Sequence, residues 1–190
     1  MKPKVLLAGD SISFGYGPGV IEMLKGEFEV SNLPGNGGTS SNLLSHMDDW
    51  ILGPGYDAVH LNCGLHDIAF ERDRGRNRVS IGDYRENLCS IADTIMDGGP
   101  VLSWASTTPV IYLRHRRNKP FDRKEKDVLS YNRVAAGIMA DRGVKIDDLH
   151  AAVESSGRKR CIGEDGVHMT EFGNGVLSRT VASFIRGMDL

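Results

Sequence analysis

Short apolar runs alternate with longer amphipathic segments along the chain. Five of these runs have the length of buried strands, and each stands beside Gly, Pro or polar residues that favour turns. The predicted strands are Val5–Ala8, Phe28–Val30, Ala58–Leu61, Pro100–Trp104 and Val144–Ile146.

Three further segments carry apolar residues at spacings of three and four, the period of a helix with one buried face. We expect Asp122 and Glu125 to form a capping box for the second helix, and Thr170 to cap the third. The apolar stripes are Ile81, Tyr84, Leu88, Ile91 and Ile95; Val128, Tyr131, Ala135 and Ile138; and Val176, Leu177, Val181, Phe184 and Ile185.

Strands that alternate with helices predict βαβ units and therefore an α/β fold. The expected architecture is a mostly parallel sheet of about five strands covered by helices on both faces, within one domain over residues 1–190. Ligands bind such sheets beyond the carboxyl ends of the strands. The residues that directly follow each strand are therefore the candidates for chemistry.

Composition narrows the function classes. The chain has 190 residues, 40% of them hydrophobic, and a formal net charge of −2, which provides no general attraction for nucleic acid or an anionic membrane. Cys63, Cys89 and Cys161 are odd in number and scattered, so we expect neither a disulfide framework nor a zinc site. The apolar run that follows Lys4 is too short for a signal peptide, and we expect a cytoplasmic protein.

Two loops carry the residues of a nucleophilic site. Ser11 follows the first predicted strand in Gly9-Asp10-Ser11, where its hydroxyl can be exposed near a helix N-terminus. Asp165 and His168 lie three residues apart just before the last helix. Either feature alone is typical of an ordinary turn, but together they supply a nucleophile, a base and a group that orients the base.

The chain resembles the SGNH (GDSL-like) hydrolases, serine esterases and lipases with four ordered motifs. The segments of this chain that match the four motifs, in the same order, are Gly9-Asp10-Ser11, Asn36-Gly37-Gly38-Thr39-Ser40, Gly64-Leu65-His66-Asp67 and Asp165-Gly166-Val167-His168. The resemblance covers essentially the whole chain. It implies a three-layer, flavodoxin-like fold, a Ser11-His168-Asp165 triad, and ester hydrolysis through an acyl-enzyme.

The resemblance also implies an oxyanion hole formed by the Ser11 amide, a glycine amide and a side chain at position 66. We select Gly38 over Gly35 and Gly37 because a Thr-Ser pair and then a helix follow it directly. Position 66 holds a histidine where the family has asparagine. A neutral His66 can donate one hydrogen bond in its place, or it can contact the substrate instead.

The remaining polar residues near these motifs have structural interpretations. We expect Asp10 and Asp67 to accept backbone N–H groups in their turns, and Cys63 and His60 to be packed in the core. The segment from Glu71 to Arg78 contains four arginines, Arg72, Arg74, Arg76 and Arg78. It is either a solvated loop or a rim that binds a carboxylate or phosphate of the substrate.

The sequence thus favours an acyl or acetyl esterase that uses no metal or cofactor and acts on a small-molecule or carbohydrate ester. Nucleic acid and membranes are not expected partners, and the oligomeric state stays open. A first alternative is a binding protein of the same fold, weakened catalytically at His66. A second is a nucleotide-binding protein whose phosphate loop is Gly15–Gly19, although its spacing is not GxGxxG and Pro18 removes an N–H donor.

Overall fold

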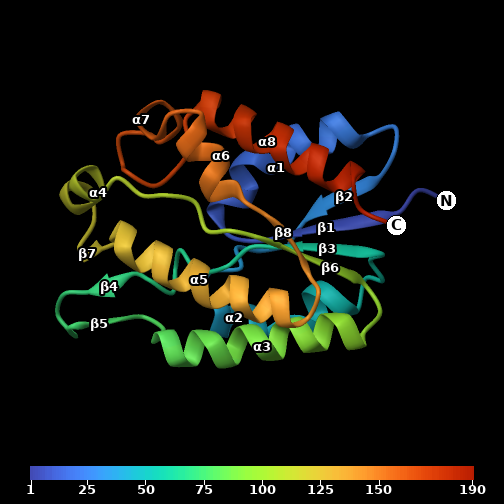
Figure 1. Ribbon diagram of the computed structural model, residues 1–190, viewed down its shortest axis with the longest axis horizontal. Coiled ribbons are helices and arrows are strands. Elements are labelled where there is room, and N and C mark those ends of the chain that lie inside the picture. Colours follow the sequence, from blue (N-terminus) through green and yellow to red (C-terminus); the bar gives the residue numbers. More distant parts are fainter.

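A five-stranded parallel sheet forms the centre of the molecule in the computed structural model, which describes residues 1–190 (Figure 1). The strand order is β2-β1-β3-β6-β8, and every neighbouring pair is parallel. The strands are β1 (Lys4–Ala8), β2 (Glu29–Asn32), β3 (Ala58–Leu61), β6 (Val101–Ala105) and β8 (Lys145–Asp147). The predicted parallel sheet is confirmed: β3 has the predicted limits, and the ends of the other strands differ from those expected by at most two residues.

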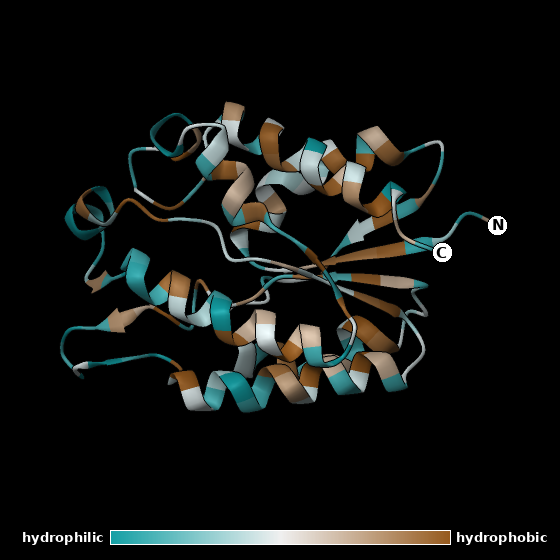
Figure 2. Cartoon of the chain, in the orientation of Figure 1, coloured by the Kyte–Doolittle hydropathy of each residue, from teal (hydrophilic) through white to brown (hydrophobic).

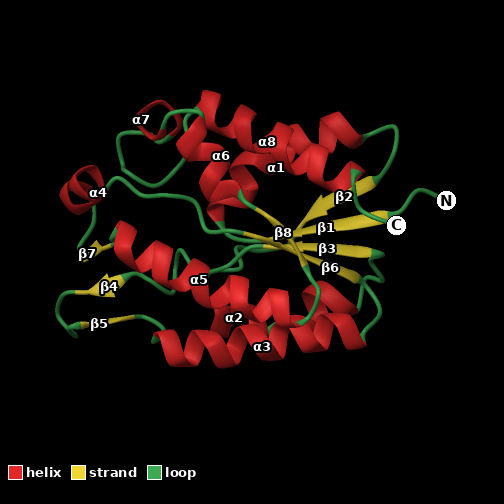
Figure 3. Ribbon diagram, in the orientation of Figure 1, coloured by secondary structure: helices red, strands yellow, loops and turns green.

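Helices cover both faces of this sheet, which makes the predicted three layers (Figure 3). One layer contains α1 (Ser11–Leu24), α6 (Leu149–Ser155) and α8 (Glu171–Arg186), and the other contains α2 (Ser40–Ser45), α3 (Ile81–Asp97) and α5 (Glu125–Asp141). The π-helical turn η1 (Asp48–Leu52) and the short helices α4 (Tyr112–Asn118) and α7 (Arg158–Cys161) complete the helical elements. No helix is long and apolar enough to cross a membrane.

The apolar stripes predicted from the sequence are buried, except for Ile81, which is exposed at the start of α3, and Phe184, which is half-buried. One connected cluster of 44 buried hydrophobic residues extends from Val5 to Ile185 and forms the core. In Figure 2 the central strands are brown, whereas the connection between the two short strands β4 and β5 at the left is teal. Burial of these stripes is the main force that holds the layers together.

A second, three-stranded antiparallel sheet was not predicted. It consists of β4 (Phe70–Glu71), β5 (Arg76–Asn77) and β7 (Phe121–Asp122), in the order β5-β4-β7. It lies with α4 at the end of the molecule toward which the main strands run (Figure 1). Strands of two residues carry no readable alternation of polar and apolar positions, which is why the sequence did not show them.

Two of the predicted caps had different outcomes. Thr170 caps α8 as expected, since its Oγ1 accepts the Gly173 amide at 3.1 Å. The capping box at Asp122 and Glu125 is wrong. Asp122 belongs to β7, and α5 starts after Lys124 without a side-chain cap.

The glycines at 15, 17 and 19 do not form a phosphate loop, because they lie within α1. A Cβ at Gly19 would approach Ser178 Oγ to 2.4 Å, and one at Gly15 would approach Asn174 Oδ1 to 2.7 Å. Gly15 and Gly19 therefore allow α1 to pack closely against α8, and Gly17 allows a close approach to Asn32 of β2. The nucleotide-binding alternative loses the loop on which it depended.

Candidate active site

Ser11 is held at the start of α1 by the turn that follows β1. Asp10 is the N-cap of this helix, and its Oδ1 accepts the Ile12 amide at 2.9 Å. Ser11 occupies the first helical position, whose N–H has no acceptor within the helix. The hydroxyl and the amide of one residue therefore both lie at a helix N-terminus, where negative charge is stabilised.

The Asp165–His168 loop brings a histidine to this serine. Ser11 Oγ lies 2.9 Å from His168 Nε2, and His168 Nδ1 is hydrogen-bonded to Asp165 Oδ2. The other oxygen of Asp165 accepts the amides of Val167 and His168, both at 3.0 Å. The three residues, separated by up to 157 positions in sequence, form one continuous chain of hydrogen bonds.

Gly166 explains why this loop has its shape. Its φ is +77°, and a Cβ there would come within 2.5 Å of His115 N and Ile111 O. The Ile111 amide donates to the Gly166 carbonyl at 2.8 Å, which ties the loop to the start of α4. Any side chain at position 166 would displace the loop that presents His168.

The electrostatics keep Asp165 ionised beside His168. Burial alone would raise the pKa of Asp165, but hydrogen bonds from the His168 side chain and from the two amides outweigh it, so the pKa lies below its ordinary value. A carboxylate here fixes the imidazole tautomer and stabilises the ring when it takes a proton. The side chain of His168 is 50% exposed, so the pair is open to a bulky substrate.

His66 lies close to Asp10, the residue before Ser11. Its Nε2 is 4.0 Å from Asp10 Oδ2, and its side chain is 25% exposed. Burial lowers the pKa of His66, with Arg123, Arg78 and His168 acting in the same direction and Asp10 against it. The ring is therefore neutral at pH 7, which is the form that the predicted donor role requires.

Gly38 has a different environment from the one we expected. Its amide donates to Asn36 Oδ1 at 2.9 Å, so an oxyanion would have to displace that side chain. The neighbouring Gly37 amide donates to Gly9 O at 3.0 Å. Assignment of Gly38 to an oxyanion hole stays a prediction.

The structural interpretations of the nearby polar residues agree with their contacts. Asp67 accepts the amide and the hydroxyl of Ser40, and burial raises its pKa to about 6. Cys63 is buried, and His60 is buried with its Nε2 3.0 Å from Asp147 Oδ2. Asp10 accepts an amide with Oδ1, whereas its buried Oδ2 has no hydrogen-bond partner.

Three of the four arginines of the predicted rim are paired with carboxylates, two of them within their own loop. Arg74 and Arg78 both donate to Glu71, and Arg72 donates to Asp122 at 2.6 Å. Two buried residues were not predicted. Arg123 is 5% exposed and follows β7, and His115 is 0% exposed and lies against Gly166. Neither residue stands after a predicted strand or in a periodic segment, so no sequence signal marked them.

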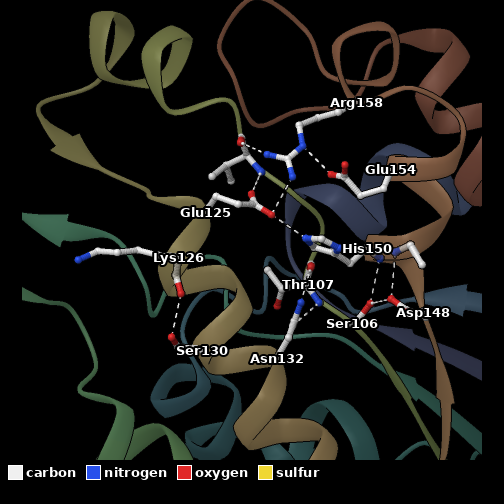
Figure 4. A network of polar contacts seen from close by, with 12 residues as sticks. Ser106, Thr107, Glu125, Lys126, Ser130, Asn132, Asp148, His150, Glu154 and Arg158 are labelled. Atoms are coloured by element: carbon white, nitrogen blue, oxygen red, sulfur yellow. Dashed lines mark hydrogen bonds and ion pairs between the residues drawn. The ribbon is translucent and has the colours of Figure 1, made fainter.

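A second polar cluster lies between α5, α6 and α7, and we call its members Glu125, His150, Glu154 and Arg158 the Glu125 network (Figure 4). Glu125 Oε1 accepts His150 Nε2 at 2.7 Å and Arg158 Nη2 at 3.0 Å, while Glu125 Oε2 accepts the Val110 amide at 2.9 Å. Two carboxylates and a histidine at this spacing have the donor types of a metal site. Arg158 already bridges the two carboxylates, so its positive charge opposes a metal ion there.

Neither protein-family models nor curated protein sequences match the chain. Solved structures do match in fold. A lipase/acylhydrolase from Enterococcus faecalis is 21% identical with a TM-score of 0.83, over 98% of this chain and 96% of that one.

Two acetylxylan esterases are also similar. One is 19% identical with a TM-score of 0.79, over 96% of this chain and 99% of that one. Another, Axe2 from Geobacillus stearothermophilus, is 18% identical with a TM-score of 0.77, over 98% and 95%. The chain therefore has the fold of GDSL-like acylhydrolases and acetylxylan esterases, as its resemblance to the SGNH hydrolases implied.

Proposed function

We propose that this protein is a serine ester hydrolase in which Ser11, His168 and Asp165 form the catalytic triad. The observation that carries the proposal is the hydrogen-bonded chain from Ser11 Oγ through the His168 ring to Asp165. Structures of catalytic mutants of the Geobacillus esterase carry a serine-to-alanine or a histidine-to-alanine change, which supports the same pair of roles here.

The geometry suits acyl transfer in two steps. Ser11 Oγ attacks the ester carbonyl carbon while its proton moves to His168 Nε2, and Asp165 stabilises the resulting imidazolium. The tetrahedral oxyanion accepts a hydrogen bond from the Ser11 amide and, in our assignment, from His66. His168 then gives its proton to the departing alkoxide, which leaves an acyl group on Ser11.

A water molecule completes the cycle by the reverse order of proton transfers. His168 takes a proton from the water as its oxygen attacks the acyl carbon, and then returns the proton to Ser11 Oγ as the acid departs. We infer a small acyl group, such as acetyl on a carbohydrate, as the substrate. The half-exposed His168 and the acetylxylan esterases of the same fold support this substrate class.

Hydrolysis of p-nitrophenyl esters of increasing chain length tests the proposal. We expect turnover that is greatest for acetate or another short acyl group and that disappears in Ser11→Ala. The exposed Ser90, on α3, provides the matched control Ser90→Ala, which should retain turnover. A serine-directed organophosphonate should add one adduct, located on Ser11 by peptide mass spectrometry.

Turnover that persists in Ser11→Ala would contradict the assignment of the nucleophile. Absence of both turnover and adduct in the wild type would favour the alternative of a binding protein with this fold. Two observations support that alternative: the Gly38 amide already donates to Asn36, and position 66 holds a histidine.

A further inference from the structure

Arg123 is a buried guanidinium with most of its hydrogen-bonding capacity unused. It follows β7, is 5% exposed, and donates from Nε to the Leu65 carbonyl at 2.6 Å. The structure gives Arg123 no ion pair, whereas Arg72 pairs with Asp122 at 2.6 Å. Asp10 and Asp165 act on Arg123 through their charge but lie beyond ion-pair distance, and a buried charge without a direct partner is costly.

The terminal nitrogens of Arg123 are not fully enclosed. They make no hydrogen bond within the protein, and they are not among the polar atoms that are fully enclosed without a partner. A guanidinium fork that is held by its Nε and open at its Nη atoms matches a carboxylate or phosphate bidentately.

Arg123 belongs to the surroundings of Ser11 through a short series of contacts. The carbonyl that holds it is that of Leu65, the residue before His66. His66 Nε2 is 4.0 Å from Asp10 Oδ2, and Asp10 caps the helix that Ser11 begins. The positive charge of Arg123 also contributes to the lowered pKa values of His66 and His115, next to burial as the main cause.

A second guanidinium lies on the same aromatic ring. The Cζ atoms of Arg78 and Arg123 are 4.6 Å and 5.0 Å from the centroid of Phe121, which fixes both side chains by cation–π contact. Arg78 and Phe121 also line a cavity of about 390 Å³, to which Arg123 itself does not contribute. Its lining residues are Glu71, Arg72, Asp73, Arg78, Pro120 and Phe121.

We propose that Arg123, flanked by Arg78, binds an anionic oxygen group of the substrate close to the ester that Ser11 attacks. The substrate class is then an ester of an acidic small molecule or sugar, such as an acetylated uronic acid or sugar phosphate. This inference rests on the proposed function for the ester, while the anion site itself is testable by binding alone.

Binding to Ser11→Ala tests the anion site without turnover. Calorimetric titrations with glucuronate, glucose 6-phosphate and glucose compare a carboxylate, a phosphate and a neutral sugar. We expect at least one anionic sugar to bind on the order of tenfold or more tighter than glucose, as for a charge-assisted bidentate contact. The tighter of the two identifies the anion, and equal, weak binding of all three would overturn the proposal.

Turnover of a matched pair of esters tests the same site in the wild type. Acetylated methyl glucuronoside and acetylated methyl glucoside differ in one carboxylate, and acetate release gives kcat/KM for each. If glucose 6-phosphate binds tighter than glucuronate, the acetylated sugar phosphate replaces the glucuronoside in this pair. We expect a preference for the anionic ester that Arg123→Met removes and that Arg123→Lys keeps in part, because lysine retains charge without the fork.

The exposed Arg74 of the neighbouring loop provides the control Arg74→Met, which should keep the anionic preference. A preference that survives in a folded Arg123→Met would overturn the role of Arg123. If the wild type shows no p-nitrophenyl acetate hydrolysis that depends on Ser11, the proposed function is overturned instead. The titrations on Ser11→Ala would still show whether the anion site exists. The two failures are therefore distinguishable.

Discussion

Two polar clusters in this protein differ in how completely their charges are paired. In the Glu125 network, Glu125 accepts hydrogen bonds from His150, Arg158 and the Val110 amide. Beside Ser11, in contrast, Asp10 Oδ2 is buried without a hydrogen-bond partner, and Arg123 is buried without an ion pair.

The difference separates a structural role from a functional one. Buried polar groups in folded proteins are nearly always satisfied, so a paired cluster such as the Glu125 network is explained by stability alone. Unpaired groups next to a serine and a histidine in hydrogen-bond contact retain capacity for a ligand. Activity should therefore depend on the cluster beside Ser11, and stability on the Glu125 network.

The largest expected effect is at His168, the proposed base. His168→Ala should lower kcat on p-nitrophenyl acetate by about 10³-fold or more, because Ser11 then has no group to accept its proton. The half-exposed ring makes little contribution to packing, so the thermal unfolding midpoint should stay close to that of the wild type. A kcat within tenfold of the wild type would remove His168 from the mechanism.

His66 is expected to have the next largest effect on turnover. If His66 donates to the oxyanion, His66→Ala should lower kcat by about 10²–10³-fold with a small change in KM. His66→Asn should restore most of kcat, because the asparagine amide donates in the same role. His46, stacked on Trp50, provides a histidine-to-alanine control that should keep kcat. An unchanged kcat in His66→Ala would leave substrate contact as the remaining interpretation.

Local patterns in the sequence were sufficient for the parallel sheet and for the order of the motifs. Ala58–Leu61 is a strand with the predicted limits, and the apolar stripe from Ile81 to Ile95 lies within α3. Both elements form because their own apolar side chains are buried, and the spacing of those apolar residues is visible in the local sequence.

Features that depend on partners distant in sequence were not predictable. The sequence contains Arg72 and Arg123 alike, but the first is paired and exposed whereas the second is buried and unpaired. Two further contacts were not predictable for the same reason. Asn36 accepts the Gly38 amide, and Gly166 fits against the start of α4. Only the folded chain shows which groups lack a partner.

A smaller effect, on stability rather than turnover, is expected from the Glu125 network. Glu125→Ala should lower the free energy of unfolding by about 1–3 kcal/mol, since it leaves the Val110 amide, His150 and Arg158 without their acceptor. Thermal unfolding at pH 7 measures this change. The exposed Glu164, 3.6 Å from Arg114, provides the control Glu164→Ala, for which a change of no more than about 0.5 kcal/mol is expected.

The Glu125 effect should depend on pH in a defined direction. Burial would raise the pKa of Glu125, but hydrogen bonds from His150 and the Val110 amide, with Arg158, lower it below its ordinary value in the folded state. A lowered folded pKa contributes stability that is complete above the unfolded value and is lost as pH falls through the folded one. The difference between wild type and Glu125→Ala should therefore shrink in acid, and a constant difference down to pH 3 would contradict this origin.

The smallest expected effect is at Arg74. This variant tests whether the exposed arginines of the loop have a function. Arg74 is 62% exposed and donates to Glu71 at 3.1 Å, three residues away. Exposed pairs of this kind contribute about 0–1 kcal/mol, because water solvates both charges well when they separate. Arg74→Met should therefore change the unfolding free energy by less than about 0.5 kcal/mol and leave kcat/KM on p-nitrophenyl acetate as it is. A large loss of turnover would show that the exposed loop contacts substrate, and the distinction between exposed, paired arginines and the buried, unpaired Arg123 would no longer identify the functional one.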